Sequence, residues 1–326
     1  MKYSFVVPVY HDGYLSLPFC EAIAPVLHRL VGGGRVDEQA EVIFVNDGSR
    51  DNSQQLLEQA RTRYDFVKVI ELSRNFGQHV AVSCGYRFAS GEYVFMINGD
   101  QQDPPDQIEL LLNVIEGGEA DIVTGLRAER GESFLNAITS RIFQTILNLL
   151  TGARMPLNAA SLRVMNRQFV DAYNALGERT PYIPGLENWL GFRHAYVPIR
   201  HQFRQQGKSS YNLSKRWRMA VDSIIGFSDL PLRMAAALGF AITCIGMLSI
   251  AVLAVQRFSS VNLLPGFTST ISAIVFLGGL NLMFLGLVSL YVGRILHEVQ
   301  GRPRYVLKSL AGFADSGGER ERFDAP

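Results

Sequence analysis

The sequence predicts an α/β fold, a mostly parallel sheet with helices on both faces, followed by a pair of membrane-spanning helices. Two observations carry this prediction. Over residues 1 to about 125, short apolar runs alternate with polar segments of helical composition, and strand–helix alternation implies a parallel sheet covered on both faces. After about residue 230 the chain changes character and contains two long apolar runs without a charged side chain.

Five short apolar segments are expected to be buried strands, because each is rich in Val, Ile and Phe and ends in turn-forming residues. They are residues 3–10, 41–47, 67–72, 92–98 and 120–126. Helices are expected between them at residues 49–64, 79–90 and 104–118. Ser49 or Asp51 would cap the first helix, and Pro104 and Pro105 suit the opening of the third.

Two apolar runs, residues 234–255 and 271–292, are expected to form a transmembrane hairpin. Each would span about 33 Å as a helix, which is enough to cross a hydrocarbon core of about 30 Å. Basic residues flank the hairpin on both sides, whereas the connecting loop has one basic residue. Both termini are therefore expected in the cytosol.

Two amphipathic segments, residues 134–151 and 213–230, place basic residues beside large apolar ones. Two interpretations stay open for them: ordinary core helices, or helices that lie in the membrane interface. The run from Lys215 to Arg218, which includes Trp217, favours the interface for the second segment.

The balance of charge excludes some classes of function. The 326 residues include 31 Lys and Arg against 30 Asp and Glu, a formal net charge of +1. A general polyanion binder is not expected, so nucleic acid is no partner and any basic site must be local. Three cysteines without ligand-like spacing indicate a reducing compartment, with neither a disulfide framework nor a zinc site. The N-terminal apolar run is too short for a signal peptide.

The segment from Asn98 to Asp103 follows a predicted strand and is rich in side-chain oxygens. Asn98, Asp100 and Gln102 alternate there, and hard cations such as Mg²⁺ or Mn²⁺ take oxygen ligands that they often share with substrate phosphates. A polar turn that caps the next helix is the alternative, since Asn-Gly-Asp is also good turn chemistry.

Three other strands end in polar or glycine-rich segments, "VVPVYHD", "VNDGSRDNS" and "LSRNFGQHVA". The second and third are weak signals when each is taken singly. Ligands of parallel sheets bind beyond the carboxyl ends of the strands. We therefore expect all four strand ends to line one edge of the sheet.

In this order, with "VTGLRAER", "NAASLRVMNR", "QGKSSYNLSK" and the hairpin, the chain resembles the polyprenyl-phosphate glycosyltransferases. These are inverting enzymes of glycosyltransferase family 2, a group that includes dolichol-phosphate mannose synthase. The resemblance covers about residues 3 to 308. It implies the GT-A fold, a Rossmann-like sheet, and an enzyme that transfers sugar from a nucleotide-sugar, UDP by default, to a polyprenyl phosphate such as undecaprenyl phosphate.

The resemblance implies functional residues one by one. The donor nucleotide-sugar would be held by Pro8, Tyr10, Asp12, Asp47, Arg74 and Asn75. Mg²⁺ or Mn²⁺ would bind Asp100, Gln102 and Asn98, where Asn98 replaces the family's first Asp. The lipid phosphate would be bound by Arg127, Arg163, Arg204 and Lys208. Asn158 stands where an Asp is usual, close to donor and acceptor, and with Asp100, Arg127 and Arg163 completes the expected catalytic set.

The residue patterns and the resemblance together give the expected organisation. A cytosolic GT-A catalytic domain covers residues 1–212 and includes the amphipathic helix at 134–151. A juxtamembrane interface helix (213–232), the hairpin (233–293) and a cytosolic tail (294–326), polar and disordered from about residue 311, follow. The protein would lie in the cytoplasmic membrane, would assemble as a homotetramer and would work beside a flippase.

Two other functions stay open at this point. A family 2 transferase of this kind could extend a glycan on a lipid carrier instead of using a bare phosphate. With Asn98 and Asn158 in place of carboxylates, the chain could also be a non-catalytic membrane subunit that binds a nucleotide-sugar.

Overall fold

The computed structural model describes residues 2–32, 34–127, 156, 158–179, 181–200, 237–242, 248 and 267–313. The chain divides into two compact units, one formed by Met1–Ser210 with Arg302–Pro326 and the other by Tyr211–Gly301. The predicted amphipathic segments 134–151 and 213–230 lie outside the described residues, as do Arg204 and Lys208.

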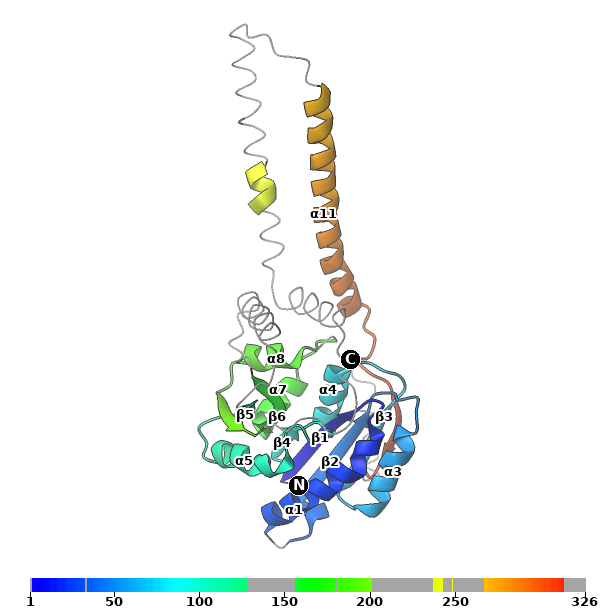
Figure 1. Ribbon diagram of the computed structural model, residues 1–326, viewed down its shortest axis with the longest axis vertical. Coiled ribbons are helices and arrows are strands. Elements are labelled where there is room, and N and C mark those ends of the chain that lie inside the picture. The colour runs from blue at the N-terminus through cyan, green and yellow to red at the C-terminus, as the bar shows by residue number, and fades with distance from the viewer. Residues whose placement is uncertain are drawn as a thin grey trace. The chain divides into compact units, whose positions relative to one another are not determined.

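The first unit is built on one eight-stranded sheet in the order β7-β5-β6-β4-β1-β2-β3-β8 (Figure 1). The strands are β1 Tyr3–Val9, β2 Ala40–Asn46, β3 Val67–Leu72, β4 Tyr93–Met96, β5 Ile122–Arg127, β6 Ala159–Asn166, β7 His194–Ile199 and β8 Leu307–Ala311. β1 pairs in parallel with β2 and β4, β2 with β3, and β5 with β7. β6 and β8 run antiparallel to their neighbours. The predicted mostly parallel sheet is confirmed.

Helices connect these strands. They are the short η1 Gly13–Leu15, α1 Ser16–Val31, α2 Val36–Gln39, α3 Ser53–Arg63, α4 Gln78–Phe88, the short η2 Pro105–Gln107, α5 Ile108–Glu116, α7 Arg167–Asn174 and α8 Ile183–Trp189. The five predicted strands and three predicted helices are confirmed within a few residues. Pro105 opens η2 as expected, and the Asp51 carboxylate accepts a hydrogen bond from the Ser53 amide at the start of α3.

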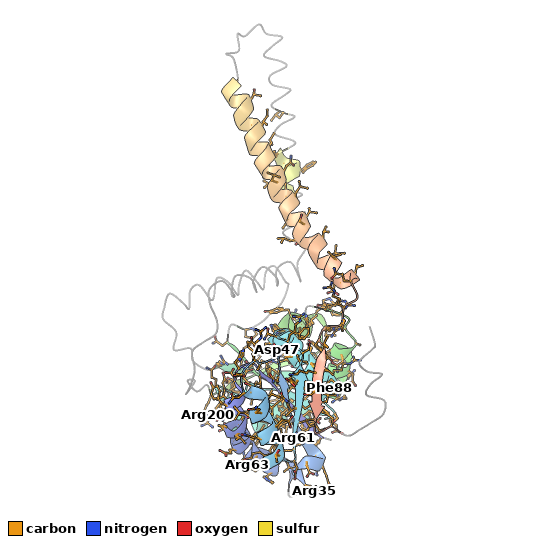
Figure 2. The ribbon with its side chains drawn as sticks, turned by 90° about the vertical axis from the view of Figure 1, so that its right-hand side faces the viewer. Arg35, Asp47, Arg61, Arg63, Phe88 and Arg200 are labelled. Atoms are coloured by element: carbon orange, nitrogen blue, oxygen red, sulfur yellow. The ribbon has the colours of Figure 1, made fainter. Side chains whose placement is uncertain are left out.

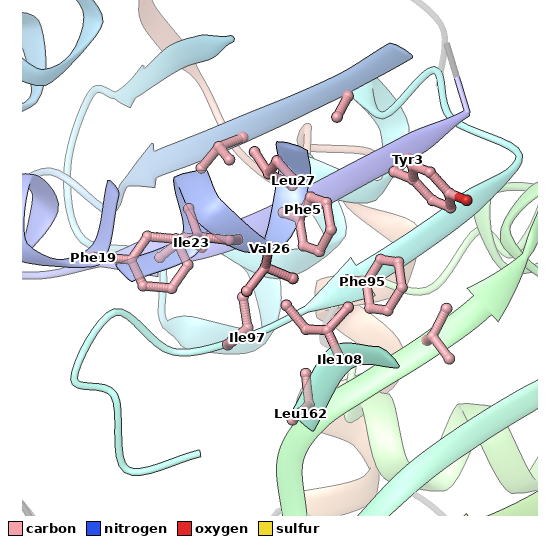
Figure 3. Close-up of a cluster of buried hydrophobic side chains, with 14 of the residues drawn as sticks. Tyr3, Phe5, Phe19, Ile23, Val26, Leu27, Phe95, Ile97, Ile108 and Leu162 are labelled. Carbon is pink, nitrogen blue, oxygen red and sulfur yellow. The ribbon is translucent and has the colours of Figure 1, made fainter. Parts of the chain in front are cut away.

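The main hydrophobic core lies between the sheet and helices α1, α3 and α5 (Figure 3). Alternate residues of β1 point to this side, and the Phe5 ring stacks on Phe95 of β4 with 4.6 Å between centroids. Phe19 of α1 meets Phe44 of β2 edge to face at 5.9 Å. β2 is buried along its whole length, as expected for a central parallel strand.

The opposite face of the sheet is covered by α4 and α7, and the α4 contact is very close. A Cβ on Gly85 would lie 2.2 Å from Cγ1 of Val6, which points to this side from β1. Gly85 therefore lets α4 approach the sheet more closely than a residue with a Cβ would allow.

In the second unit, α11 Phe267–Val299 is a 33-residue helix, and a Cβ on Gly239 would lie 3.9 Å from the Phe284 ring. Large apolar side chains of α11 are exposed, among them Leu282 and Leu285. Among the described residues, no helix combines the length and the apolar character needed to cross a membrane. Most of residues 234–255 lie outside the described residues, so the hairpin stays a prediction.

The predicted tail, residues 294–326, contains regular structure before the point where disorder was expected. Helix α11 continues to Val299, and Leu307–Ala311 forms β8 at the edge of the sheet. The backbone of this short strand pairs with β3, whose edge would otherwise expose unpaired backbone groups. Most of the part expected to be disordered, from about residue 311 on, lies outside the described residues.

We predict that Gly85→Ala lowers the free energy of unfolding by about 1–3 kcal/mol, because the new methyl group forces Val6 or α4 to move. Thermal or urea unfolding of the purified chain measures this. Gly177→Ala is the matched control, since no atom lies within 4 Å of the added Cβ. Equal losses in both variants would contradict the packing argument.

Candidate active site

The polar strand ends meet at one edge of the sheet, as predicted. β4 ends beside the start of β6, because Met96 pairs with Arg163 in antiparallel register, and this brings Asn98 to Ser161. β5 ends there too, where the Arg127 amide donates a 3.0 Å hydrogen bond to the Asn158 carbonyl. Loops after β1, β2 and β3 reach the same edge because those strands are parallel to β4.

The loops after β1 and β2 are tied to each other by serine hydroxyls. The His11 amide donates to Ser49 Oγ at 3.0 Å, and the Gly13 amide donates to Ser53 Oγ at 3.1 Å. Pro8 lies within β1, Asp12 precedes η1, and the Tyr10 ring is 46% exposed at the sheet edge. The first predicted donor residues are therefore together, with Tyr10 open to a ligand.

Asp47, labelled in Figure 2, directly follows β2 at this edge. Its carboxylate is 2% exposed and accepts hydrogen bonds from Asn75 Nδ2 at 2.9 Å, the Phe76 amide at 2.7 Å and the Gly77 amide at 2.9 Å. Burial raises the pKa of Asp47, against the opposing effect of the two amides and the Arg74 charge. The carboxylate therefore holds the loop after β3, in which Ser73, Arg74 and Asn75 are exposed.

Asn46, the residue before Asp47, is hydrogen-bonded through both ends of its side-chain amide. Its side chain is fully buried; Oδ1 accepts a hydrogen bond from the Ser49 amide at 3.0 Å and Nδ2 donates to Gln54 Oε1 at 2.9 Å. A carboxylate could accept the first bond but could not donate the second. An amide at this position therefore suits the turn.

The segment from Asn98 to Gln102 is half-buried at the edge. Asn98 Nδ2 donates to Ser161 Oγ at 2.9 Å, and its Oδ1 accepts from Gln78 Nε2 at 3.3 Å. Asp100 Oδ1 accepts from the Gln102 amide at 3.2 Å, across a left-handed Gln101 with φ of 55°. The segment is therefore a polar turn that also brings several side-chain oxygens together. This geometry is compatible with both interpretations, a turn and a metal site.

The oxygen ligands of this segment are compatible with a hard cation that also binds the substrate. Within the described ranges, no group of three His, Cys, Asp or Glu side chains could hold a metal. Asp100 supplies one carboxylate, and Asn98 and Gln102 supply neutral amide oxygens. Mg²⁺ commonly binds through one or two carboxylates together with substrate phosphates, so these residues fit a metal that the substrate helps to hold.

Asp103 orients Arg127. The carboxylate of Asp103 is 2% exposed and receives hydrogen bonds from Nε and Nη2 of Arg127, both at 3.1 Å. It also accepts from the Ser161 amide at 3.1 Å. Asp103 therefore fixes the arginine by a two-point contact and ties β5 to β6. The sequence analysis placed Asp103 near the site but did not predict that it binds Arg127. The two residues are far apart in the sequence and meet only in the folded structure.

The structure places Arg163 differently from the expectation. Nη1 of Arg163 donates to both carboxylate oxygens of Glu187 at 2.6 and 2.7 Å, and Nε and Nη2 donate at 3.3 Å to the carbonyls of Ser161 and Ala160. The ion pair is buried. In this structure the Arg163 guanidinium is therefore buried and paired with Glu187, whereas the expectation was an arginine available to a phosphate.

A polar cluster surrounds this ion pair. Tyr173 and Ser83 share a hydrogen bond of 2.7 Å between their hydroxyls, and the His79 ring meets Tyr182 edge to face at 5.5 Å. Burial, with the nearby Arg163 charge, lowers the pKa of His79 to about 4. The imidazole is therefore neutral at physiological pH.

The comparisons with known proteins agree with this architecture. Residues 4–173 match Glycosyl transferase family 2. The chain is 35% identical to the uncharacterized glycosyltransferase sll0501 of Synechocystis, over 96% of each chain. It is 32% identical to the undecaprenyl-phosphate 4-deoxy-4-formamido-L-arabinose transferase of Yersinia pestis, over 95% of this chain and 94% of that protein.

Among solved structures, the chain is similar to glucosyl-3-phosphoglycerate synthase from Mycobacterium tuberculosis in complex with Mn²⁺ and uridine-diphosphate-glucose. The identity is 16%, the TM-score is 0.48, and the match covers 69% of this chain and 77% of the other. The family match and the relatives define a glycosyltransferase. The chain belongs to glycosyltransferase family 2.

We predict that Glu187→Gln lowers the free energy of unfolding by about 3–5 kcal/mol, because it leaves the buried Arg163 charge without its partner. The double variant Arg163→Met with Glu187→Leu should recover most of that loss, since no buried charge then remains. Urea unfolding measures both. A loss below about 1 kcal/mol in Glu187→Gln would contradict a buried ion pair.

A second prediction concerns acid stability. The folded pKa of His79, about 4, lies below an unfolded value of about 6.5, so the unfolded chain binds the proton first as pH falls. Stability should therefore decrease from about pH 6.5 towards pH 4, by at most about 1.4 kcal/mol per pH unit for this group. His79→Gln should flatten that slope in unfolding experiments, with the exposed His28→Gln as control. An unchanged slope would contradict the assignment.

Proposed function

We propose that the protein transfers a sugar from a nucleotide-sugar to a polyprenyl phosphate, with inversion of the anomeric configuration, at the cytosolic membrane surface. The observation that carries this proposal is the meeting of two parts at one edge: the oxygen-rich Asn98–Gln102 segment and Arg127, which Asp103 orients. The undecaprenyl-phosphate transferases among the relatives support the choice of acceptor.

The donor half of the site would be formed by the loops after β1, β2 and β3. Tyr10 exposes an aromatic face suited to a nucleotide base, and Arg74 is an exposed cation on the loop that Asp47 holds. We assign Pro8, Asp12 and Asn75 to the same half. Asp47 acts mainly through that loop, because its oxygens already accept three hydrogen bonds.

The acceptor half would be formed around Arg127. Two of its N–H groups are bound by Asp103, which fixes the plane of the guanidinium, and a guanidinium fork suits the oxygens of a phosphate monoester. Arg204 and Lys208 remain proposed partners of the same phosphate. Arg163 would contribute indirectly, since its contacts with the Ser161 and Ala160 carbonyls fix the start of β6.

The reaction then needs little help from a base. A phosphate monoester has its second pKa near about 6 and is largely dianionic at neutral pH. One of its oxygens attacks the anomeric carbon from the face opposite the nucleotide diphosphate. A new carbon–oxygen bond forms while the bond to the diphosphate breaks, and the nucleotide diphosphate leaves with the electron pair.

This chemistry accounts for the amides at the site. Asn158 and Asn98 cannot take a proton as a carboxylate would, and the dianionic acceptor does not require it. Asp100, Asn98 and Gln102 would hold Mg²⁺ or Mn²⁺, which neutralises charge on the diphosphate when bound. Asn158 lies beside Arg127 through its carbonyl, where a change of side chain would influence the choice of sugar.

The lipid acceptor motivates the rest of the proposed organisation. A hairpin over residues 233–293 would keep the site at the height of a lipid phosphate, with both termini in the cytosol. The exposed apolar side chains of α11 and the uncharged sequence of both runs support this. Assembly as a homotetramer and a flippase for the product are further parts of the proposal that rest on the family resemblance.

The direct test is a transfer assay in nanodiscs. Undecaprenyl phosphate is supplied with UDP-, GDP- and dTDP-sugars and with Mg²⁺ or Mn²⁺, each reaction is repeated in EDTA, and lipid products are detected by mass spectrometry. We expect one UDP-sugar to give a sugar-phosphate-lipid that disappears in EDTA. Nucleotide binding without any product would instead favour another acceptor or a non-catalytic subunit.

Within that assay we predict that Asp103→Asn lowers kcat/KM for the lipid phosphate about 10- to 100-fold, because displaced orienting groups cost rates of that order. The KM for the nucleotide-sugar should change little. Asp106→Asn is the matched control, since Asp106 pairs with Arg200 at the surface. Equal effects of the two variants would contradict a special role for Asp103.

A further inference from the structure

After α11 the chain returns to the first unit and adds β8 to its sheet. β8 pairs antiparallel with β3, with Ile70 opposite Leu310 and Leu72 opposite Leu307. Side chains reinforce the pairing, because Glu71 of β3 accepts a hydrogen bond from Lys308 Nζ at 2.7 Å and from Ser309 Oγ at 3.0 Å. Glu71 is 8% exposed, so its carboxylate is largely shielded from water, whereas the Lys308 side chain is 62% exposed.

The residues just before β8 reach the loop that follows β3. The Ser73 amide donates a 2.9 Å hydrogen bond to the Val306 carbonyl, and Ser73 directly precedes Arg74 and Asn75. We call residues 73–77 the donor loop. Its first residue is therefore bound by the C-terminal segment.

The other side of the donor loop is bound by the end of β2. Asp47 accepts the three hydrogen bonds from residues 75–77. Gly48 has a φ of 62° and lies so close to the loop that a Cβ there would be 2.2 Å from the Arg74 carbonyl carbon. The donor loop is thus held between β2 and the segment that leads into β8.

Several contacts fix the C-terminal segment itself. The Arg304 guanidinium donates to the carbonyl of Leu176, and the Tyr305 hydroxyl interacts with Cys84 of α4. Beyond β8 the Phe313 ring meets Phe88, labelled in Figure 2, at 5.5 Å, and Lys68 lies 5.0 Å from the Phe313 centroid. These contacts exceed what is needed to cover a strand edge, and two of them reach α4, which begins directly after the donor loop.

We propose that β8 and its leading residues, 304–313, are a positioning element of the donor site, which acts through the donor loop. Without this element Arg74 and Asn75 would keep only the contacts from β2, and the loop would sample more conformations. A nucleotide would then bind more weakly, because ordering the loop would oppose binding. The inference rests on the proposed function, since it takes the loop to be part of a nucleotide-sugar site.

The test uses the full chain in nanodiscs and reverses one charge of the β3–β8 contact. Lys308→Glu places a second carboxylate beside the shielded Glu71 and should weaken the pairing. Glu71→Lys combined with Lys308→Glu restores opposite charges. Lys2→Glu is the matched control, since Lys2 also pairs with a glutamate, Glu116 at 3.4 Å, at the opposite end of β1 from the site.

Two quantities are measured for each variant: hydrogen–deuterium exchange of residues 73–77 without ligand, and the affinity for UDP in the presence of Mn²⁺. In Lys308→Glu we expect faster exchange in the donor loop and about five- to tenfold weaker UDP binding. The double variant should approach the wild type in both measurements. The control Lys2→Glu should have the same exchange and the same UDP affinity as the wild type.

The inference would be overturned if Lys308→Glu had the exchange rate and the UDP affinity of the wild type. It would also be overturned if Lys2→Glu lost as much UDP affinity as Lys308→Glu. Faster exchange with unchanged UDP affinity would also overturn it, because the loop would then be held by β8 without serving the donor. If the wild-type chain binds no nucleotide at all, the proposed function fails, whereas the exchange measurement still decides whether β8 fixes residues 73–77.

Discussion

The register of the sheet is the constraint on which the rest of the structure depends. Parallel pairing of β4, β1, β2 and β3 brings four loops to one edge, and antiparallel β6 adds its first residues there. A one-residue slip would reverse the direction of the side chains on a strand, so the buried core of Phe5, Phe44 and Phe95 also fixes the site. Packing and function are therefore set by the same pairing.

Two buried carboxylates at this edge bind different parts of the site. Asp47 and Asp103 are each 2% exposed, and both accept hydrogen bonds from other parts of the protein. Asp47 binds the loop after β3, and Asp103 binds Arg127. Asp100 and Arg74 are more exposed, and in the proposed function they contact the ligand. Acceptors buried in a low-dielectric setting hold their donors tightly, which keeps both halves of the site in place before a substrate arrives.

The sequence predicted those parts of the structure that depend on local pattern. Strands such as 67–72 and helices such as 104–118 were recognisable from composition and turn residues, and so was the gathering of polar strand ends. The strand β8 was missed, because five residues far from the rest of the sheet carry no periodic signal. Arg163 was expected to bind a phosphate, since only tertiary structure shows that Glu187 lies opposite it. The same limit hid the role of Asp103.

The central claim is that the Asn98–Gln102 segment holds a divalent ion together with the donor diphosphate. Electron paramagnetic resonance of Mn²⁺, titrated with the chain in the presence and absence of UDP, tests it most directly. We expect weak Mn²⁺ binding without UDP, because one carboxylate supplies little charge. Binding should be strong with UDP and should be lost in Asp100→Ala. Equal Mn²⁺ binding by Asp100→Ala and the wild type in the presence of UDP would contradict the account.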